Sequence, residues 1–172
     1  MDNALPDESA ELTSRPPQRE DVVGLCRELN RLGAKYVVVG GFAVIEAGYP
    51  RTTGDIDLLV DPAGDNEVKV FEALSILPDR AVLELDPGDV GRFTVVRVSD
   101  EVLVDLMAKA SGISYEEAKD HIHVRELDGV KIPFANPDLL WRMKSRSYRP
   151  KDQGDIAFLR ELFAAEGRRP PE

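Results

Sequence analysis

The sequence predicts a single domain of the α/β class. Its 172 residues are enough to bury one proper core. Segments with apolar residues at helical spacing alternate with short β-branched runs, a pattern typical of helices packed on a sheet. No apolar run approaches the roughly 20 residues needed to span a bilayer, and the acidic N-terminus lacks the features of a signal peptide. We therefore expect a cytoplasmic protein without a membrane segment.

The first half of the chain is predicted to run helix, strand, helix, strand, helix. Residues 19–32 have helical apolar spacing and are followed by Gly33, a suitable C-cap. The continuous β-branched run over 35–40 is typical of a strand buried on both faces. The remaining elements of this half are a short helix over 42–48, a strand over 55–60 and an amphipathic helix over 65–77.

The second half is predicted to contain two β-hairpins and three helices. Turn residues between β-branched runs indicate the hairpins, and a capping box and a proline mark helix boundaries. The predicted segments are a hairpin of 92–98 with 102–107, a helix after Gly112 that opens with Ser114 and Glu117, a hairpin around Asp128-Gly129, and helices over 138–146 and 152–166.

The predicted domain spans residues 19–167. It comprises a core over 19–110 and a C-terminal hairpin and helices over 111–167. Residues 1–18 are polar and contain prolines, so we expect a flexible tail there, and we expect 168–172 to fray.

Composition limits the function classes. A formal net charge of -10 argues against sequence-blind binding to nucleic acid, which needs Lys and Arg over a broad surface, although it allows a local basic groove. The single cysteine, Cys26, lies in an apolar helical segment with no second thiol, which favours a buried structural thiol.

Two aspartates interrupt the apolar strand predicted over 55–60. Asp55 and Asp57 are two residues apart, so their carboxylates project from the same face while Ile56 and Leu58 point the other way. Two adjacent like charges repel, and burying them uncompensated would cost several kcal/mol. A divalent cation that prefers oxygen ligands, such as Mg²⁺, would compensate them.

Asp105 interrupts a second apolar strand in the same way. An isolated Asp-x-Asp most often holds one aspartate that caps a loop and another that faces solvent. Three strand aspartates instead could hold two metal ions about 3.5–4 Å apart, an arrangement that serves phosphoryl transfer. Gly40 and Gly41, between a strand and a helix, would let backbone N–H groups approach a phosphate closely.

The stretch GGFAVIEAGYPRTTGDIDLLV, residues 40–60, resembles the signature of the polymerase-β-like nucleotidyltransferase superfamily, in which a Gly-Gly or Gly-Ser pair precedes Asp-x-Asp. With Arg51 and Thr53 before the aspartates, it is similar to the minimal nucleotidyltransferases of bacterial toxin–antitoxin systems, of the AbiEii and MenT type. It also resembles some antibiotic nucleotidyltransferases. The similarity extends to Lys144 and to the run Lys151-Asp152-Gln153-Gly154-Asp155.

The resemblance implies a nucleotidyltransferase fold: a short mixed β-sheet backed by helices, with a C-terminal helical portion that closes a nucleotide cleft. It implies transfer of a nucleoside monophosphate from an NTP, ATP among them, to a hydroxyl group with release of pyrophosphate. Two Mg²⁺ ions, or Mn²⁺, are expected. The implied metal-binding and catalytic residues are Asp55, Asp57 and Asp105, and the implied phosphate-binding residues are Gly40, Gly41, Arg51, Thr53 and Lys144.

The basic segment around Lys144 supports the same site. Five Lys or Arg residues lie within ten positions of an acidic protein, and a field of that sign could hold a triphosphate or an RNA backbone. Lys144 and then Arg149 are the preferred candidates, and a solvated helix face is the alternative for each.

Several functions remain open from the sequence. The acceptor could be an RNA or tRNA 3′ end, a protein hydroxyl or a small molecule such as an antibiotic. A toxin would have a neutralising antitoxin partner. The alternative class is a catalytically silent module of the same fold that binds a nucleotide or a partner.

Overall fold

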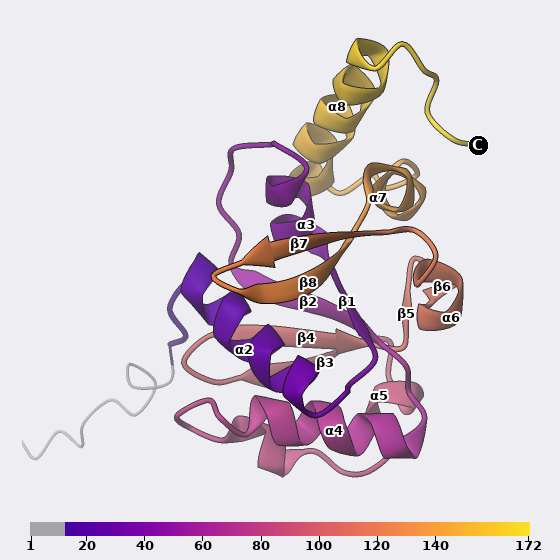
Figure 1. Cartoon of the computed structure of the whole chain (residues 1–172). Helices are drawn as coiled ribbons and strands as arrows, with labels where there is room; N and C mark the ends of the chain where they lie inside the picture. The colour runs from indigo at the N-terminus through magenta and orange to yellow at the C-terminus, as the bar shows by residue number, and fades with distance from the viewer. Residues whose placement is uncertain (1–12) are drawn as a thin grey trace, which may run out of the picture.

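A six-stranded mixed sheet forms the centre of the computed structural model, which describes residues 13–172 (Figure 1). The strand order is β3-β4-β2-β1-β8-β7, and β5 and β6 form a separate two-stranded sheet. The strands are β1 (Tyr36–Val39), β2 (Asp55–Val60), β3 (Val96–Ser99), β4 (Leu103–Met107), β5 (Lys109–Ala110), β6 (Ile113–Ser114), β7 (Ile122–Leu127) and β8 (Val130–Ala135). This architecture confirms the predicted α/β class with a short mixed sheet.

Helices cover the sheet and extend beyond it. They are α2 (Arg19–Arg31), α3 (Gly40–Glu46), α4 (Gly64–Leu74), a 3-10 turn η1 (Ala81–Glu84), α5 (Asp89–Arg92), α6 (Tyr115–Ala118), α7 (Pro137–Lys144) and α8 (Pro150–Ala165). Helix α2 packs on β8 and α4, whereas α3 packs on β1, β2 and α7. The yellow helix α8 lies beside α7 and extends away from the sheet (Figure 1). No helix in residues 13–172 is long and apolar enough to cross a membrane.

The central strands bring distant segments side by side. Strand β2 is antiparallel to β1 and parallel to β4, and its register places Asp57 opposite Asp105. Strand β3 is antiparallel to β4 with Arg97 opposite Asp105, and β8 runs parallel to β1. Because parallel neighbours in register present side chains on the same face, Asp57 and Asp105 must emerge together.

Apolar residues on the other face of β2 explain why this strand forms. Ile56, Leu58 and Val60 are fully buried, as the alternation predicts. Cys26 on α2 is also fully buried, and burial raises the pKa of its thiol to about 12. The sulfur is therefore a protonated core group, as predicted, rather than a reactive thiolate.

Some predicted boundaries are wrong. The strand expected to begin at Arg92 begins at Val96, because Arg92 ends the short helix α5 after the turn at Gly88, whose φ is +91°. Helix α3 begins at Gly40 rather than at Phe42. The helix expected after Gly112 is confined to the four residues of α6, although Ser114 caps it as predicted.

The first 12 residues of the predicted tail over 1–18 lie outside the described part of the chain. Residues 13–18 form no helix or strand but contact the turn between β3 and β4. The Ser14 hydroxyl donates to the carbonyl of Asp100 at 2.6 Å, and the Arg15 N–H donates to the carbonyl of Glu101 at 2.9 Å. The segment then leads into α2 beside the cleft described below.

Candidate active site

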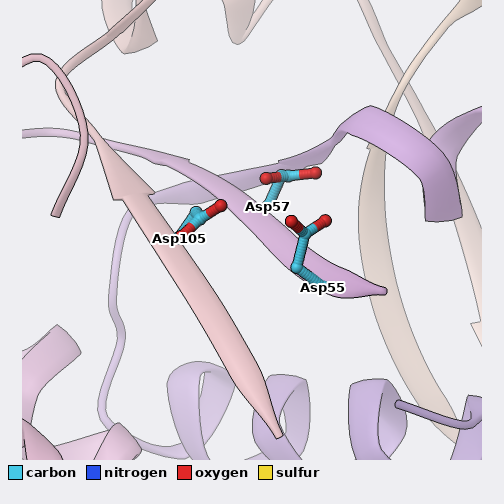
Figure 2. A group of neighbouring side chains, drawn as sticks. All are labelled: Asp55, Asp57 and Asp105. Atoms are coloured by element: carbon cyan, nitrogen blue, oxygen red, sulfur yellow. The ribbon is translucent and has the colours of Figure 1, made fainter. Parts of the chain in front are cut away.

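Three carboxylates meet where β2 and β4 lie side by side. Each of Asp55, Asp57 and Asp105 offers an oxygen atom, and these three atoms lie within 4.8 Å of one another. Figure 2 shows Asp55 and Asp57 on one strand and Asp105 on its neighbour, with the carboxylates gathered over the two strands. The sequence predicted this cluster from three aspartates that interrupt two apolar strand patterns, and the register of β2 and β4 assembles it.

A negative charge on Asp57 is unfavourable in this cluster. Burial, and then the negative charges of Asp55 and Asp105, raise the pKa of Asp57 to about 7. Within residues 13–172, no Lys or Arg nitrogen lies within 4.0 Å of the Asp57 carboxylate. All three donors are carboxylate oxygens, the ligand type that Mg²⁺ and Mn²⁺ prefer. The donor set therefore fits a divalent cation.

Gly40 lies directly against Asp57. Its φ is +66°, and a Cβ added there would lie 2.0 Å from Asp57 Oδ2. Only glycine combines this left-handed conformation with such a close approach. The lack of a side chain at position 40 thus lets the Asp57 carboxylate pack against the backbone at the end of β1.

Gly41 makes a similar close approach to Arg51 and Thr53. A Cβ at Gly41 would lie 2.4 Å from the Thr53 hydroxyl oxygen and 3.2 Å from a terminal Arg51 nitrogen. The structure thereby brings together the four residues predicted to bind phosphate in this half of the site. Helix α3 has only seven residues, so we expect the backbone N–H groups at the glycines, rather than a helix dipole, to contact a phosphate.

Two buried aspartates on α8 pair with three basic side chains of the site. Lys144 Nζ lies 3.1 Å from Asp152 Oδ1 and 3.1 Å from Asp155 Oδ2. Arg51 also binds Asp155, with Nε 2.8 Å from Oδ1 and a terminal nitrogen 2.9 Å from Oδ2. Arg149 Nε donates to Asp152 at 3.0 Å. Asp155 therefore links the loop before β2 to α7 and α8.

Asp152 is ionised despite its burial. Burial alone would raise its pKa, but hydrogen bonds from Arg149 and Ser147 and the charge of Lys144 together hold the pKa well below the usual range. Asp152 and Asp155 were visible in the sequence as part of the Lys-Asp-x-x-Asp run but were not predicted as site residues. Their signal was the i, i+3 spacing of two acids at the start of the helix predicted over 152–166.

The three aspartates and the basic residues line one cleft of about 1130 Å³. Its lining includes every residue predicted for the site: Gly40, Gly41, Arg51, Thr53, Asp55, Asp57, Asp105, Lys144 and Arg149. Lys109, Lys151 and Arg97 line it as well. The structure thus joins two sequence regions about 90 residues apart into one cavity large enough for a nucleotide and a second molecule.

The cleft carries charges of both signs. Beside the carboxylate cluster, Arg97, Arg51 and Lys109 line it. Lys144, Arg149 and Lys151, from the end of α7 and the start of α8, form its basic wall, and Asp152 lies among them. Carboxylates beside a basic wall are complementary to a divalent cation bound to a polyphosphate.

Replacing Gly40 with Ala should damage this site more than a glycine-to-alanine change at an equally strained turn. We expect loss of metal-dependent stabilisation, because the new methyl group must displace Asp57. Gly112→Ala is the matched control, since Gly112 has φ +80° and open space around it. Thermal unfolding with and without Mg²⁺ measures the effect; equal responses of the two variants would contradict the packing at Gly40.

Comparison with known structures identifies the fold. The sequence matches no protein-family model and no curated protein. The structure is similar to that of a lincosamide antibiotic adenylyltransferase, LnuA, solved with lincomycin bound. The TM-score is 0.56 at 15% identity, and the match covers 86% of this chain and 99% of that chain.

A second similar structure is an antigenic nucleotidyltransferase-like protein from Paracoccidioides brasiliensis. The TM-score is 0.53 at 20% identity, and the match covers 86% of this chain and 78% of that chain. The chain therefore has the nucleotidyltransferase fold, as the sequence resemblance implied.

Proposed function

We propose that this protein is a metal-dependent nucleotidyltransferase that transfers a nucleoside monophosphate from an NTP to a hydroxyl group and releases pyrophosphate. The observation that carries the proposal is the convergence of Asp55, Asp57 and Asp105 on one face of the sheet, in a cleft that the basic wall also lines. Proteins that share a fold can have different functions, so these site residues, and not the fold, carry the proposal.

The residues have distinct roles in the proposed reaction. The carboxylate cluster would bind Mg²⁺ or Mn²⁺ at Asp55 and Asp57, with Asp105 beside them, and the cation would neutralise the charge that develops on the transferring phosphoryl group. Backbone N–H groups at Gly40 and Gly41 would contact the triphosphate, together with Thr53 and Arg51, whose side chains lie close to Gly41. No covalent enzyme intermediate is required, because positioning and charge neutralisation lower the barrier.

Lys144 and Arg149 would contact the phosphates from the basic wall of the cleft. The Lys144 ammonium is fixed between Asp152 and Asp155, so it offers a pre-positioned donor at low conformational cost. The Arg149 side chain is 65% exposed and can reorient toward a ligand. Lys151, whose charge opposes the raised pKa of Asp57, lies near enough to the cluster to act on the same ligand.

Two acceptor classes have specific support. An RNA end, as for a toxin of the AbiEii or MenT type, fits the positive wall and its continuation through Arg146 and the 97% exposed Tyr148, since an aromatic ring among arginines can stack on a base. A small-molecule hydroxyl, such as that of an antibiotic, fits the size of the cleft and the likeness to a lincosamide adenylyltransferase. A toxin would also have an antitoxin partner.

An acceptor screen tests the proposal. The full chain is incubated with Mg²⁺ and each α-³²P-labelled NTP in turn, together with total RNA, total protein, aminoglycosides or lincosamides. We expect label in one acceptor fraction, dependent on Mg²⁺. Nucleotide binding without labelling of any fraction would instead support a catalytically silent module of the same fold.

A further inference from the structure

Arg97 lies within the carboxylate cluster. Strand β3 places it opposite Asp105, and its Nε donates to Asp105 Oδ1 at 2.8 Å. A terminal nitrogen donates to Asp105 Oδ2 at 2.9 Å and to Asp55 Oδ2 at 2.9 Å. The guanidinium therefore engages both oxygens of Asp105 in a bidentate pair and bridges to Asp55.

This geometry determines which carboxylate remains free for a metal. A pair of metal ions would need oxygens of Asp105 and Asp55 in addition to Asp57. Both Asp105 oxygens and one Asp55 oxygen already accept hydrogen bonds from Arg97, whereas Asp57 receives none from it. Asp57 and the remaining oxygen of Asp55 are thus the open ligands.

The net charge of the cluster is consistent with one bound cation. Three carboxylates and one guanidinium leave two negative charges, which a single divalent cation neutralises. Arginine stays charged under all ordinary conditions, and its planar fork matches a carboxylate, so the bidentate pair is a durable substitute for an ion. The half-exposed Arg97 side chain also faces the cleft, where free N–H groups can meet a ligand.

We propose that Arg97 fills the second cation position, so that this site holds one divalent cation, bound by Asp57 and Asp55. The inference rests on the proposed function and departs from the two-ion arrangement expected from the sequence. Arg97 remains on Asp105 when the cation binds, and its half-exposed side chain still lines the cleft. Asp105 then acts by holding Arg97 rather than by holding a metal.

Manganese binding tests this assignment without an activity assay. The full chain is titrated with Mn²⁺, alone and with one equivalent of a non-hydrolysable ATP analogue, and bound ions are counted by calorimetry and electron paramagnetic resonance. We expect one Mn²⁺ per chain in both conditions, with the six-line spectrum of an isolated ion. In Arg97→Ala we expect two ions, with a spectrum broadened by spin coupling at about 3.5–4 Å.

Three further variants make the result decisive. Arg97→Lys should keep a single ion, because an ammonium also supplies a fixed positive charge, and Arg92→Ala on α5 should match the wild type. Two coupled ions in the wild type, or an unchanged count and affinity in Arg97→Ala, would overturn the role of Arg97. If wild type and Asp57→Asn bind Mn²⁺ equally, the metal site itself, and with it the proposed function, is wrong.

Discussion

Asp57→Asn is expected to lower nucleotide transfer by at least about 1000-fold while the protein remains folded. Asn keeps the size of the side chain but removes the charge that would bind the cation, and Asp57 is the carboxylate of the cluster that has no cationic partner within residues 13–172. The rate is measured as kcat/KM for the NTP, and circular dichroism reports the fold. Asp120→Asn, at an exposed position outside the cleft, is the control.

The same variant should be more stable than the wild type at neutral pH without metal. Because the folded pKa of Asp57 is raised from 3.8 to about 7, its ionisation opposes folding, and stability is lost as pH rises through this window. Asp57→Asn avoids that loss. Its free energy of unfolding should exceed that of the wild type by on the order of 2 kcal/mol above pH 7, and should not exceed it below pH 4. Equal unfolding curves of both proteins at pH 8 would contradict the like-charge repulsion at the cluster.

Lys144→Met is expected to destabilise the protein by about 2–3 kcal/mol. Its ammonium is the shared partner of Asp152 and Asp155, which are 3% and 1% exposed, so its removal leaves buried negative charge undercompensated. The remaining partners Arg51 and Arg149 limit the loss. The melting temperature should fall by about 5–10 °C for a chain of this size.

Lys109→Met is the matched control for Lys144→Met. Lys109 also lines the cleft, but it is exposed and has no carboxylate within 4.0 Å in residues 13–172. Its loss should change stability by no more than about 0.5 kcal/mol. Equal melting temperatures for the two variants would show that the α7–α8 ion network does not hold this wall of the cleft.

Strand periodicity made the carboxylate cluster predictable. Asp55 and Asp57 are i and i+2 in a strand whose other face is fully apolar, and Asp105 interrupts a comparable strand. What the sequence could not provide is the register, since a shift of one residue between β2 and β4 would direct Asp105 to the opposite face. Register depends on the whole buried face, not on the residues that form the site.

Arg97 shows the limit of local patterns. In a strand over residues 92–98, alternation places Arg92 and Arg97 on opposite faces, so that one of the two could reach the aspartates. Arg92 is not in the strand, because a glycine turn and the short α5 precede it. Which face of β3 pointed inward depended on its pairing with β4, a contact that only the assembled sheet defines.

The Lys144 network was only partly predictable. A basic cluster beside helical apolar spacing indicated a phosphate-binding wall, and Lys144 and Arg149 do line the cleft. The burial of Lys144 between Asp152 and Asp155 arises from the packing of α7 on α8. An acid in the first turn of a helix, such as Asp152, is ordinarily explained by the helix dipole. Sequence patterns located the charges but not their partners.

The most direct test of the central claim compares two labels in one reaction. The full chain receives Mg²⁺, its acceptor fraction and the preferred NTP labelled with ³²P at either the α or the γ phosphate. We predict that α label enters the acceptor while γ label is released as pyrophosphate, and that EDTA or Asp57→Asn abolishes both. Transfer of γ label to the acceptor, or α transfer that survives in Asp57→Asn, would contradict nucleotidyl transfer at this carboxylate cluster.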